Sequence, residues 1–240
     1  MNLRASQMEV FVGTSGWMYS WNSGGSLDWY LSNSGLNAIE LNASFYRFPF
    51  PNQVKSWASK GSKLRWSVKV NRLITHNYKF SEKGLLSWQK FTKLFNPLDG
   101  VIDFYLFQLP PMMKPSMAPK MEAFIRKSKL SERFALEVRN ITWFKDEWVK
   151  WATELGITWV SIDSPDFPLD VYNTSGIVYE RIHGRSSWYT HNYKDKELIE
   201  IRQRIIDAKP KKVFIYFNNN SDMLGNACRM LELLNGKLAT

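Results

Sequence analysis

The chain places two side chains of opposite charge at the end of one predicted strand. In the stretch 134–144, side chains alternate between two faces, so that Glu137 and Arg139 share one face while Phe134, Leu136 and Val138 share the other. A helical pattern begins near residue 145, which puts the charged pair at the carboxyl end of a strand that leads into a helix. Ligand sites of parallel α/β sheets lie at that end, so we expect a polar pocket there.

Residues of similar chemistry end the other predicted strands. His183 has a side chain that titrates near neutral pH and is a natural general acid or base, and Glu40 or Glu137 could share the proton transfer. We therefore expect Glu137, His183 and Glu40 to be catalytic. The residues expected to bind substrate are Lys69, Arg139, Arg181, Asn42, Asp163, Gln108, Asn218, Trp17 and Trp188.

Other interpretations of these residues remain open at this stage. The charges could instead pair with one another into a salt-bridged plug at the carboxyl ends of the strands, because burying an unpaired charge costs several kcal/mol. Lys69 could form a Schiff base if it is desolvated. Glu137, Asp163 and His183 suit Mn, Mg or Zn, but no metal-binding spacing supports them and we predict no metal site. The segment 218–222 could seat a phosphate or simply cap the helix that follows. The sequence leaves the cofactor unknown.

The elements that position these residues alternate regularly along the chain. Apolar runs and period-two patterns predict strands, and apolar spacings of three and four predict helices between them. The predicted strands are 9–13, 37–41, 64–70, 103–107, 134–139, 158–162, 176–182 and 212–217. The predicted helices are 27–34, 51–60, 81–95, 117–127, 146–155, 194–208 and 222–234.

This alternation indicates the α/β class, with a parallel sheet and helical crossovers. Eight such units predict a TIM-like (β/α) barrel with eight parallel strands, formed by residues 1–240 as a single domain. The segment after Asp163 contains Ser-Pro-Asp-Phe-Pro, so the sixth helix is expected to be irregular. An open doubly wound sheet is the alternative, but a Gly-x-Gly-x-x-Gly turn does not follow the first strand.

Composition sets weaker limits on function. Aromatic residues make up 15% of the 240 residues and include 11 Trp, of which several fall in predicted loops where they could stack on a sugar or a base. The formal net charge is +10, which permits binding of nucleic acid or of a small anion. The basic residues are scattered, so an ordinary basic surface explains them as well.

Location and assembly are indicated only by default. Cys228 is the one cysteine, so no intrachain disulfide forms, which fits a reducing compartment. No signal peptide precedes the first strand, and no apolar run approaches the length of about 18 residues that spans a bilayer. We expect a cytoplasmic protein without a membrane partner, and the oligomeric state stays open.

Seven segments, spread over nearly the whole chain, form a specific ordered set. They are Gly-Thr-Ser-Gly-Trp at 13–17, Glu-Leu-Asn-Ala-Ser-Phe-Tyr-Arg-Phe-Pro at 40–49, Ser-Val-Lys-Val at 67–70 with Thr75-His76, Phe-Gln-Leu-Pro-Pro at 107–111, Glu-Val-Arg at 137–139 with Trp143-Phe144, Arg-Ile-His-Gly-Arg at 181–185, and Tyr-Phe-Asn-Asn at 216–219. Together these segments resemble the domain of unknown function 72 family, the YecE-like proteins. The resemblance implies a TIM-like barrel and no established activity.

Three functions remain in competition. The first is an enzyme that uses acid–base chemistry on a small polar substrate, anionic or carbohydrate-like, bound at the carboxyl ends of the strands. The second is a nucleic-acid-binding or nuclease-like protein, whose affinity would fall steeply with salt. The third is a non-catalytic module that binds a metabolite and is stabilised by it without turnover.

Overall fold

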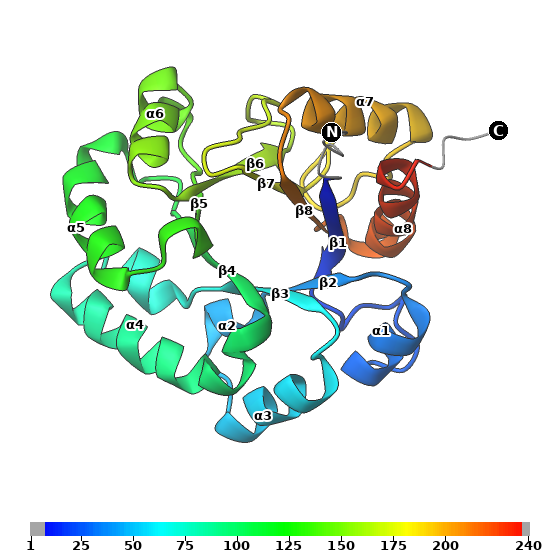
Figure 1. The fold of residues 1–240 in the computed structure, drawn as a ribbon, viewed down its shortest axis with the longest axis horizontal. Coiled ribbons are helices and arrows are strands. Elements are labelled where there is room, and N and C mark those ends of the chain that lie inside the picture. Colours follow the sequence, from blue (N-terminus) through cyan, green and yellow to red (C-terminus); the bar gives the residue numbers. More distant parts are fainter. Residues whose placement is uncertain (1–7, 237–240) are drawn as a thin grey trace, which may run out of the picture.

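The computed structural model describes residues 8–236, whose strands close into a parallel barrel (Figure 1). Each strand pairs with its neighbour in the sequence, and the last pairs with the first, Glu9 opposite Lys212. The expected barrel of eight parallel strands is confirmed, and the open sheet is not. The strands are β1 (Glu9–Ser15), β2 (Ala38–Leu41), β3 (Arg65–Lys69), β4 (Ile102–Gln108), β5 (Phe134–Glu137), β6 (Thr158–Asp163), β7 (Ile177–Ile182) and β8 (Lys212–Phe217).

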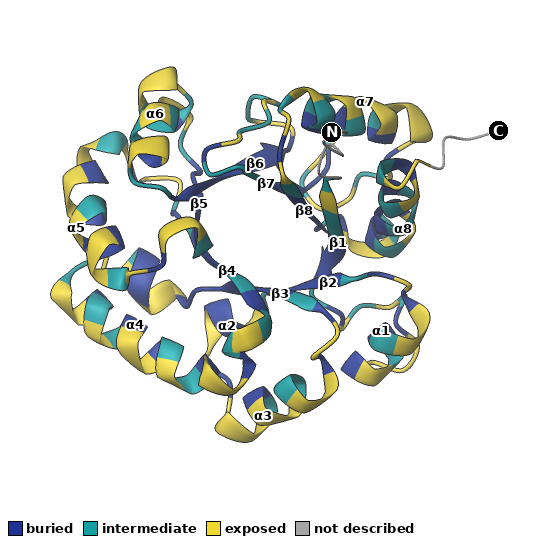
Figure 2. Ribbon diagram, viewed as in Figure 1, coloured by how far each residue is buried: buried dark blue, intermediate teal, exposed yellow. Residues whose placement is uncertain are grey.

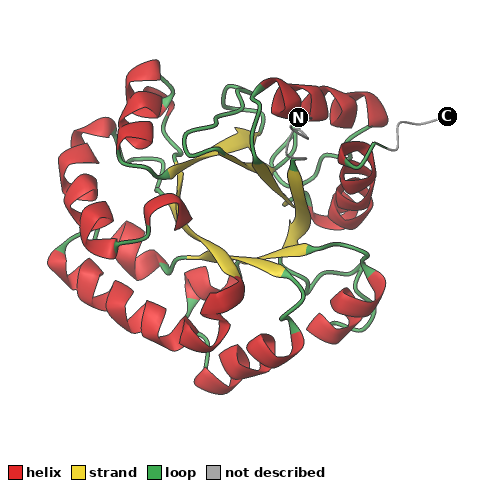
Figure 3. Ribbon diagram, viewed as in Figure 1, coloured by secondary structure: helices red, strands yellow, loops and turns green. Residues whose placement is uncertain are grey.

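Helices form a ring around the barrel (Figures 1 and 3). They are α1 (Leu27–Asn33), α2 (Ala43–Tyr46), α3 (Pro51–Lys60), α4 (Glu82–Phe95), α5 (Ala118–Ser128), α6 (Asp146–Glu154), α7 (Asp195–Asp207) and α8 (Met223–Leu234). The short α2 and a π-helical turn at Leu73–Asn77 lay outside the sequence prediction. Between β6 and β7 the described chain forms no helix, so the irregular sixth crossover is confirmed.

Each helix buries the side that faces the barrel and exposes the other (Figure 2). In α4, Trp88, Phe91 and Phe95 form the buried stripe that the spacing of three and four predicts. Ser81 begins this helix, because its side chain accepts a hydrogen bond from the backbone N–H of Gly84. Helix α3 begins at Pro51, where the missing N–H of proline costs nothing.

Aromatic side chains fill the middle of the barrel. Phe104 lies 4.8 Å from Phe214 and 5.0 Å from Tyr179, centroid to centroid, and Tyr179 lies 5.1 Å from Tyr216. These rings are at most 1% exposed. Tyr179 points its hydroxyl toward the carboxyl ends of the strands, where Ser67 Oγ lies 2.6 Å away. The barrel is therefore a packed core, and polar groups begin above this aromatic layer.

Two glycines let segments of the chain approach closely, one in β1 and one directly after β7. A Cβ at Gly13 in β1 would overlap the backbone carbonyl of Ala38 in β2. Gly184, directly after β7, has a φ of 117°, and a Cβ there would overlap the carbonyl of Ser187. Gly184 turns the chain so that the loop 185–191 folds back over the end of β7.

The helices of residues 8–236 include none that is long and apolar enough to cross a membrane.

Candidate active site

A buried ion pair joins opposite sides of the barrel at the carboxyl ends of the strands. Arg181 of β7 donates from Nε to Oε2 of Glu40 at 2.9 Å and from Nη2 to Oε1 at 2.6 Å. Both side chains are fully buried. Ser15 Oγ and Tyr179 OH each donate to Glu40 at 2.6 Å, so every Glu40 oxygen accepts two hydrogen bonds. Glu40 is thus held in place from two strands besides its own, β1 and β7.

Glu137 of β5 is the second carboxylate of this cluster. It forms ion pairs with Arg139 and with Arg181, and Gln108 Nε2 donates to its Oε1 at 3.1 Å. Burial alone would raise the pKa of Glu137, but the positive charges of Arg139, Arg181 and Lys69 outweigh it and lower the pKa to about 2. Glu137 is therefore a carboxylate at neutral pH and cannot donate a proton in that state.

His183 lies among positive charges. Its Nε2 is 3.0 Å from Nη2 of Arg139 and 3.3 Å from Nη1 of Arg181, and since arginine only donates, this nitrogen accepts. Burial, followed by the charges of Arg139, Arg181 and Lys69, lowers the pKa of His183 well below its ordinary value. The expectation that His183 titrates near neutral pH is wrong for this environment, because the imidazolium would be one more buried cation. Asn218 contributes its amide, 3.2 Å from Nδ1.

Lys69 at the end of β3 is a further cation of this cluster and lies at its edge. Its side chain is 9% exposed, and Nζ lies 4.4 Å from the ring centroid of Phe45. Within residues 8–236, Nζ has no partner for a hydrogen bond or an ion pair. Burial and the charge of Arg181 lower the pKa of Lys69 to about 7, although Glu137 and Glu40 act in the opposite direction. A lysine whose pKa is lowered in this way is suited to take up and release a proton near neutral pH.

Trp188 packs against this cluster at Arg139 and His183. The guanidinium of Arg139 lies 4.5 Å from its ring centroid, within the range of a cation–π interaction. The indole N–H donates to Asp166 Oδ2 at 2.6 Å, and the ring lies 5.2 Å from that of His183. Trp188 therefore shields the contact between Arg139 and His183 from water.

Asp163 belongs to a different cluster. Val160 of β6 packs inside the barrel, so that alternation turns Asp163 outward, toward α7. Its carboxylate pairs with Arg185 at 2.8 Å and with Arg204 at 3.0 Å, and Tyr193 OH donates to it at 2.6 Å. The expectation that Asp163 faces the mouth with the other strand-end residues is wrong. In residues 8–236, no group of three or more His, Cys, Asp or Glu side chains could hold a metal ion.

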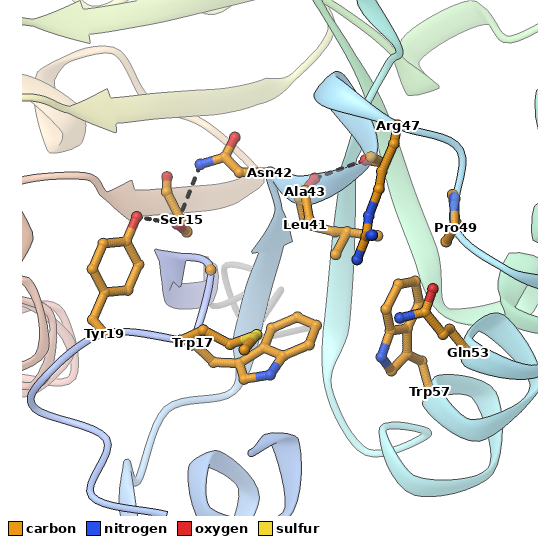
Figure 4. Close-up of a pocket in the computed structure, with 13 residues that line it drawn as sticks. Ser15, Trp17, Tyr19, Leu41, Asn42, Ala43, Arg47, Pro49, Gln53 and Trp57 are labelled. Carbon is orange, nitrogen blue, oxygen red and sulfur yellow. Dashed lines mark hydrogen bonds between the residues drawn. The ribbon is translucent and has the colours of Figure 1, made fainter. Parts of the chain in front are cut away.

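Asn42 and Trp17 line a pocket of about 230 Å³ beside the cluster (Figure 4). Asn42 precedes α2, and its Nδ2 donates to the carbonyl of Ser15 at 3.2 Å. Trp17 is 8% exposed and packs edge-on against Trp57 and Trp66. Ser15 is common to both places, because it lines the pocket while its Oγ donates to Glu40.

The sequence interpretation overlooked several residues that shape these sites. In the sequence Tyr179 is one residue of a predicted strand and carries no signal of its own. The contact of its hydroxyl with Glu40 joins two strands that are far apart in the sequence. Phe45 and Arg47 follow Asn42 directly, in the segment 40–49 that carries the family resemblance. That segment was the available signal, since a polar loop after a strand is where barrels place function.

Comparison with known proteins agrees with this fold. The family model described as "Protein of unknown function DUF72" matches residues 11–240. A DUF72 family protein from Thermotoga maritima is 24% identical, with 95% of this chain and 99% of that chain covered and a TM-score of 0.83. One from Enterococcus faecalis is 21% identical, with 96% of each chain covered and a TM-score of 0.80.

A more distant similarity extends to a sugar-converting enzyme. The structure of D-psicose 3-epimerase with D-tagatose from Clostridium cellulolyticum is 13% identical, with 97% of this chain and 100% of that chain covered and a TM-score of 0.63. At this identity the likeness concerns the fold alone. The search of curated proteins finds no match.

Proposed function

This chain belongs to the DUF72 family, and from that premise we propose that its barrel mouth is the active site of an enzyme that transfers protons on a small anionic, sugar-like substrate. The position of Lys69 carries the proposal: the residue is nearly buried, its Nζ has no hydrogen-bond or ion-pair partner in residues 8–236, and burial with the charge of Arg181 lowers its pKa to about 7. A general acid or base works best when its pKa lies near the operating pH.

Lys69 takes the role that the sequence assigned to His183 and Glu137. The neutral amine accepts a proton from a C–H or O–H group of the substrate and becomes an ammonium. Glu137 offsets the new charge, since its carboxylate already raises the pKa of Lys69. The ammonium then returns the proton to the substrate. Glu137 and Glu40 act as positioning residues, because both are held by Arg181 rather than facing a ligand.

Arg139 supplies the contact for the anionic group. Its Nε donates to Glu137 and its Nη2 to His183, while Nη1 has no hydrogen-bond partner in the part of the chain that the structure describes. Two arginines and one lysine against two carboxylates leave the cluster with one excess positive charge when Lys69 is protonated. An anion bound there gains a charge-assisted hydrogen bond of about 1.5–3 kcal/mol.

Sugar acids and sugar phosphates fit both requirements. They carry an anionic group for Arg139 and hydroxyl or carbonyl groups whose protons Lys69 could move. The D-psicose 3-epimerase that shares this barrel shape acts on a sugar, which supports sugar-like compounds as the first class to test. Its 13% identity lends no support to any residue role.

The test is proton exchange observed by NMR. Ligands that raise the melting temperature in a screen of sugar acids and sugar phosphates are incubated with the protein in D2O, and deuterium incorporation is followed. We expect Lys69→Met to slow incorporation by about 10²-fold or more, as loss of a general base does. Lys150→Met, at a side chain that is 79% exposed, is the control. Exchange at the wild-type rate in a folded Lys69→Met protein would remove the proposal.

Nucleic acid is the second candidate ligand, and a set of loop residues favours it. The loops that follow β2, β3 and β4 expose Arg47, Arg72, Lys79 and Lys114, together with the rings of Tyr46 and Tyr78. Basic and aromatic side chains of this kind bind single strands. Anisotropy of a labelled single-stranded oligonucleotide at about 50 and about 200 mM salt tests this, because phosphate contacts predict a loss of about 10³ or more in affinity. Ligand stabilisation without exchange or oligonucleotide binding would indicate a non-catalytic module.

A further inference from the structure

The pocket beside the mouth has aromatic walls. It lies between the loop that follows β1 and the segment 41–57, and its volume is about 230 Å³. Figure 4 places the rings of Tyr19, Trp17 and Trp57 around it, from both sides. Trp17 and Trp57 meet edge to face with 5.9 Å between centroids, and Trp57 stacks on Trp66. The walls are therefore fixed by packing against the core before any ligand enters.

One cation lines this pocket without an acidic partner. Arg47 follows α2, and in Figure 4 its guanidinium points toward Leu41 and Trp57. Within residues 8–236, no carboxylate lies within ion-pair distance of Arg47. Gln53 also lines the pocket, but its Oε1 already accepts the backbone N–H of Phe50 at 2.9 Å. Arg47 thus remains available to an anion.

We propose that this pocket binds a flat aromatic ring that carries one anionic group. Aromatic rings gain from stacked or edge-on contacts beyond the area they bury, and three rings surround this space. Arg47 contributes the charged hydrogen bond that a carboxylate or phosphoryl group accepts. The site is separate from Lys69 and does not depend on the function proposed for it.

Two serines connect this site with the mouth. Ser15 lines the pocket and donates through Oγ to Glu40 at 2.6 Å. Ser44 lines it too and donates to the backbone carbonyl of Lys69 at 2.6 Å. A ligand in the pocket is therefore separated by one residue from Glu40 and by one residue from Lys69. A second substrate or an effector would be suited to this position.

Binding of small probes, measured by saturation-transfer NMR, tests the proposal. Benzoate carries the ring and the charge, acetate only the charge, and benzamide the ring without the charge. We expect benzoate to bind at least about tenfold more tightly than either of the others, since each lacks one of the two contacts. Phenyl phosphate and methyl phosphate repeat the comparison and decide whether the pocket prefers a phosphoryl or a carboxylate group. Equal binding of benzoate and acetate, or no binding of either ring anion, would overturn the proposal.

Variants locate the bound ring. Ala43 is exposed and lines the pocket, so Ala43→Phe fills the space from a position that the fold tolerates. We expect it to weaken benzoate binding by about tenfold or more, whereas Ala123→Phe, at an exposed position of α5, leaves binding unchanged. Arg47→Gln should abolish the preference for benzoate over benzamide.

Lys69→Met separates this site from the mouth. Benzoate binding should persist in that variant, whether or not Lys69 transfers protons. If Lys69→Met abolishes benzoate binding while Ala43→Phe leaves it intact, the ring occupies the mouth and the pocket proposal is wrong. If Lys69→Met keeps both benzoate binding and proton exchange, the pocket stands and only the function proposed above fails.

Discussion

Arg181 donates two hydrogen bonds to Glu40 across the barrel, at 2.9 and 2.6 Å, and both side chains are fully buried. The same guanidinium also pairs with Glu137, so one cation joins β2, β5 and β7. Such a group is costly to bury alone and is stable only with both carboxylates in place. The salt-bridged plug considered from the sequence is therefore real for these three residues, while Lys69 and Arg139 lie at its outer edge.

The first prediction concerns Arg181. Arg181→Met leaves Glu40 without its cation in a buried site, and we expect the free energy of unfolding to fall by about 3–5 kcal/mol in urea denaturation. Arg126→Met, at a side chain that is 66% exposed and paired with Glu122, should change it by less than about 1 kcal/mol. Adding Glu40→Gln to Arg181→Met should restore part of the loss, because it removes the unpaired charge. Equal effects of the two single changes would contradict this account.

The second prediction concerns the titration of Lys69. Its pKa is about 7 in the folded chain against an ordinary value of 10.5, so between these values the unfolded chain binds a proton that the folded chain lacks. The contribution of Lys69 to stability is therefore least favourable below about pH 7 and improves as pH rises toward 10. Lys69→Met should stabilise the protein more near pH 7 than near pH 10. A carbon NMR titration of the lysine side chains measures the value directly, and a midpoint above about pH 9 would refute it.

Strand order and helix positions followed from the sequence because they depend on local patterns. The stripe of Trp88, Phe91 and Phe95 and the cap at Ser81 are readable within one segment. The direction in which a strand-end residue points is harder to predict. A barrel strand is buried on both faces, so Asp163 and Glu137 look alike in sequence. Val160 and Ala135 both face the barrel interior, and alternation along each strand then directs Asp163 outward and Glu137 inward.

The chemistry of the site could not be predicted because it arises between distant segments. His183 has the ordinary sequence signal of an acid–base residue, yet burial in the barrel, the charge of Arg139 from the end of another strand and that of Arg181 lower its pKa. Lys69 owes its lowered pKa to burial and to Arg181, 112 positions along the chain. The pocket of Trp17, Arg47 and Trp57 likewise needs the packing of α2 and α3 against the first loop.

The third prediction follows for His183. The ring should stay neutral from about pH 8 to about pH 6, as observed by its nitrogen chemical shifts, because burial and two arginines oppose the imidazolium. Arg139→Gln removes one of these charges and should raise the pKa of His183 toward its ordinary value. A ring that titrates near pH 6.5 in the wild-type protein would show that water or an anion reaches it.

The fourth prediction concerns Glu180 of β7, a buried carboxyl group outside the mouth. It is 1% exposed, and its Oε2 has no hydrogen-bond partner within residues 8–236. Burial and the neighbouring Asp163 raise the pKa of Glu180 to about 8, although Arg204 and Arg185 oppose this. The folded chain therefore holds a proton that the unfolded chain releases above its ordinary pKa of 4.5.

Because of Glu180, the free energy of unfolding should fall by a few kcal/mol as pH rises from about 4.5 to about 8, and it should then stay level. Glu180→Gln keeps the shape of the protonated acid and cannot ionise, so it should raise the melting temperature near pH 9 and leave it almost unchanged near pH 5. Glu154→Gln, at a side chain that is 66% exposed, should show no such pH dependence. A Glu180→Gln effect of the same size at both pH values would mean that Arg204 and Arg185 keep Glu180 ionised throughout.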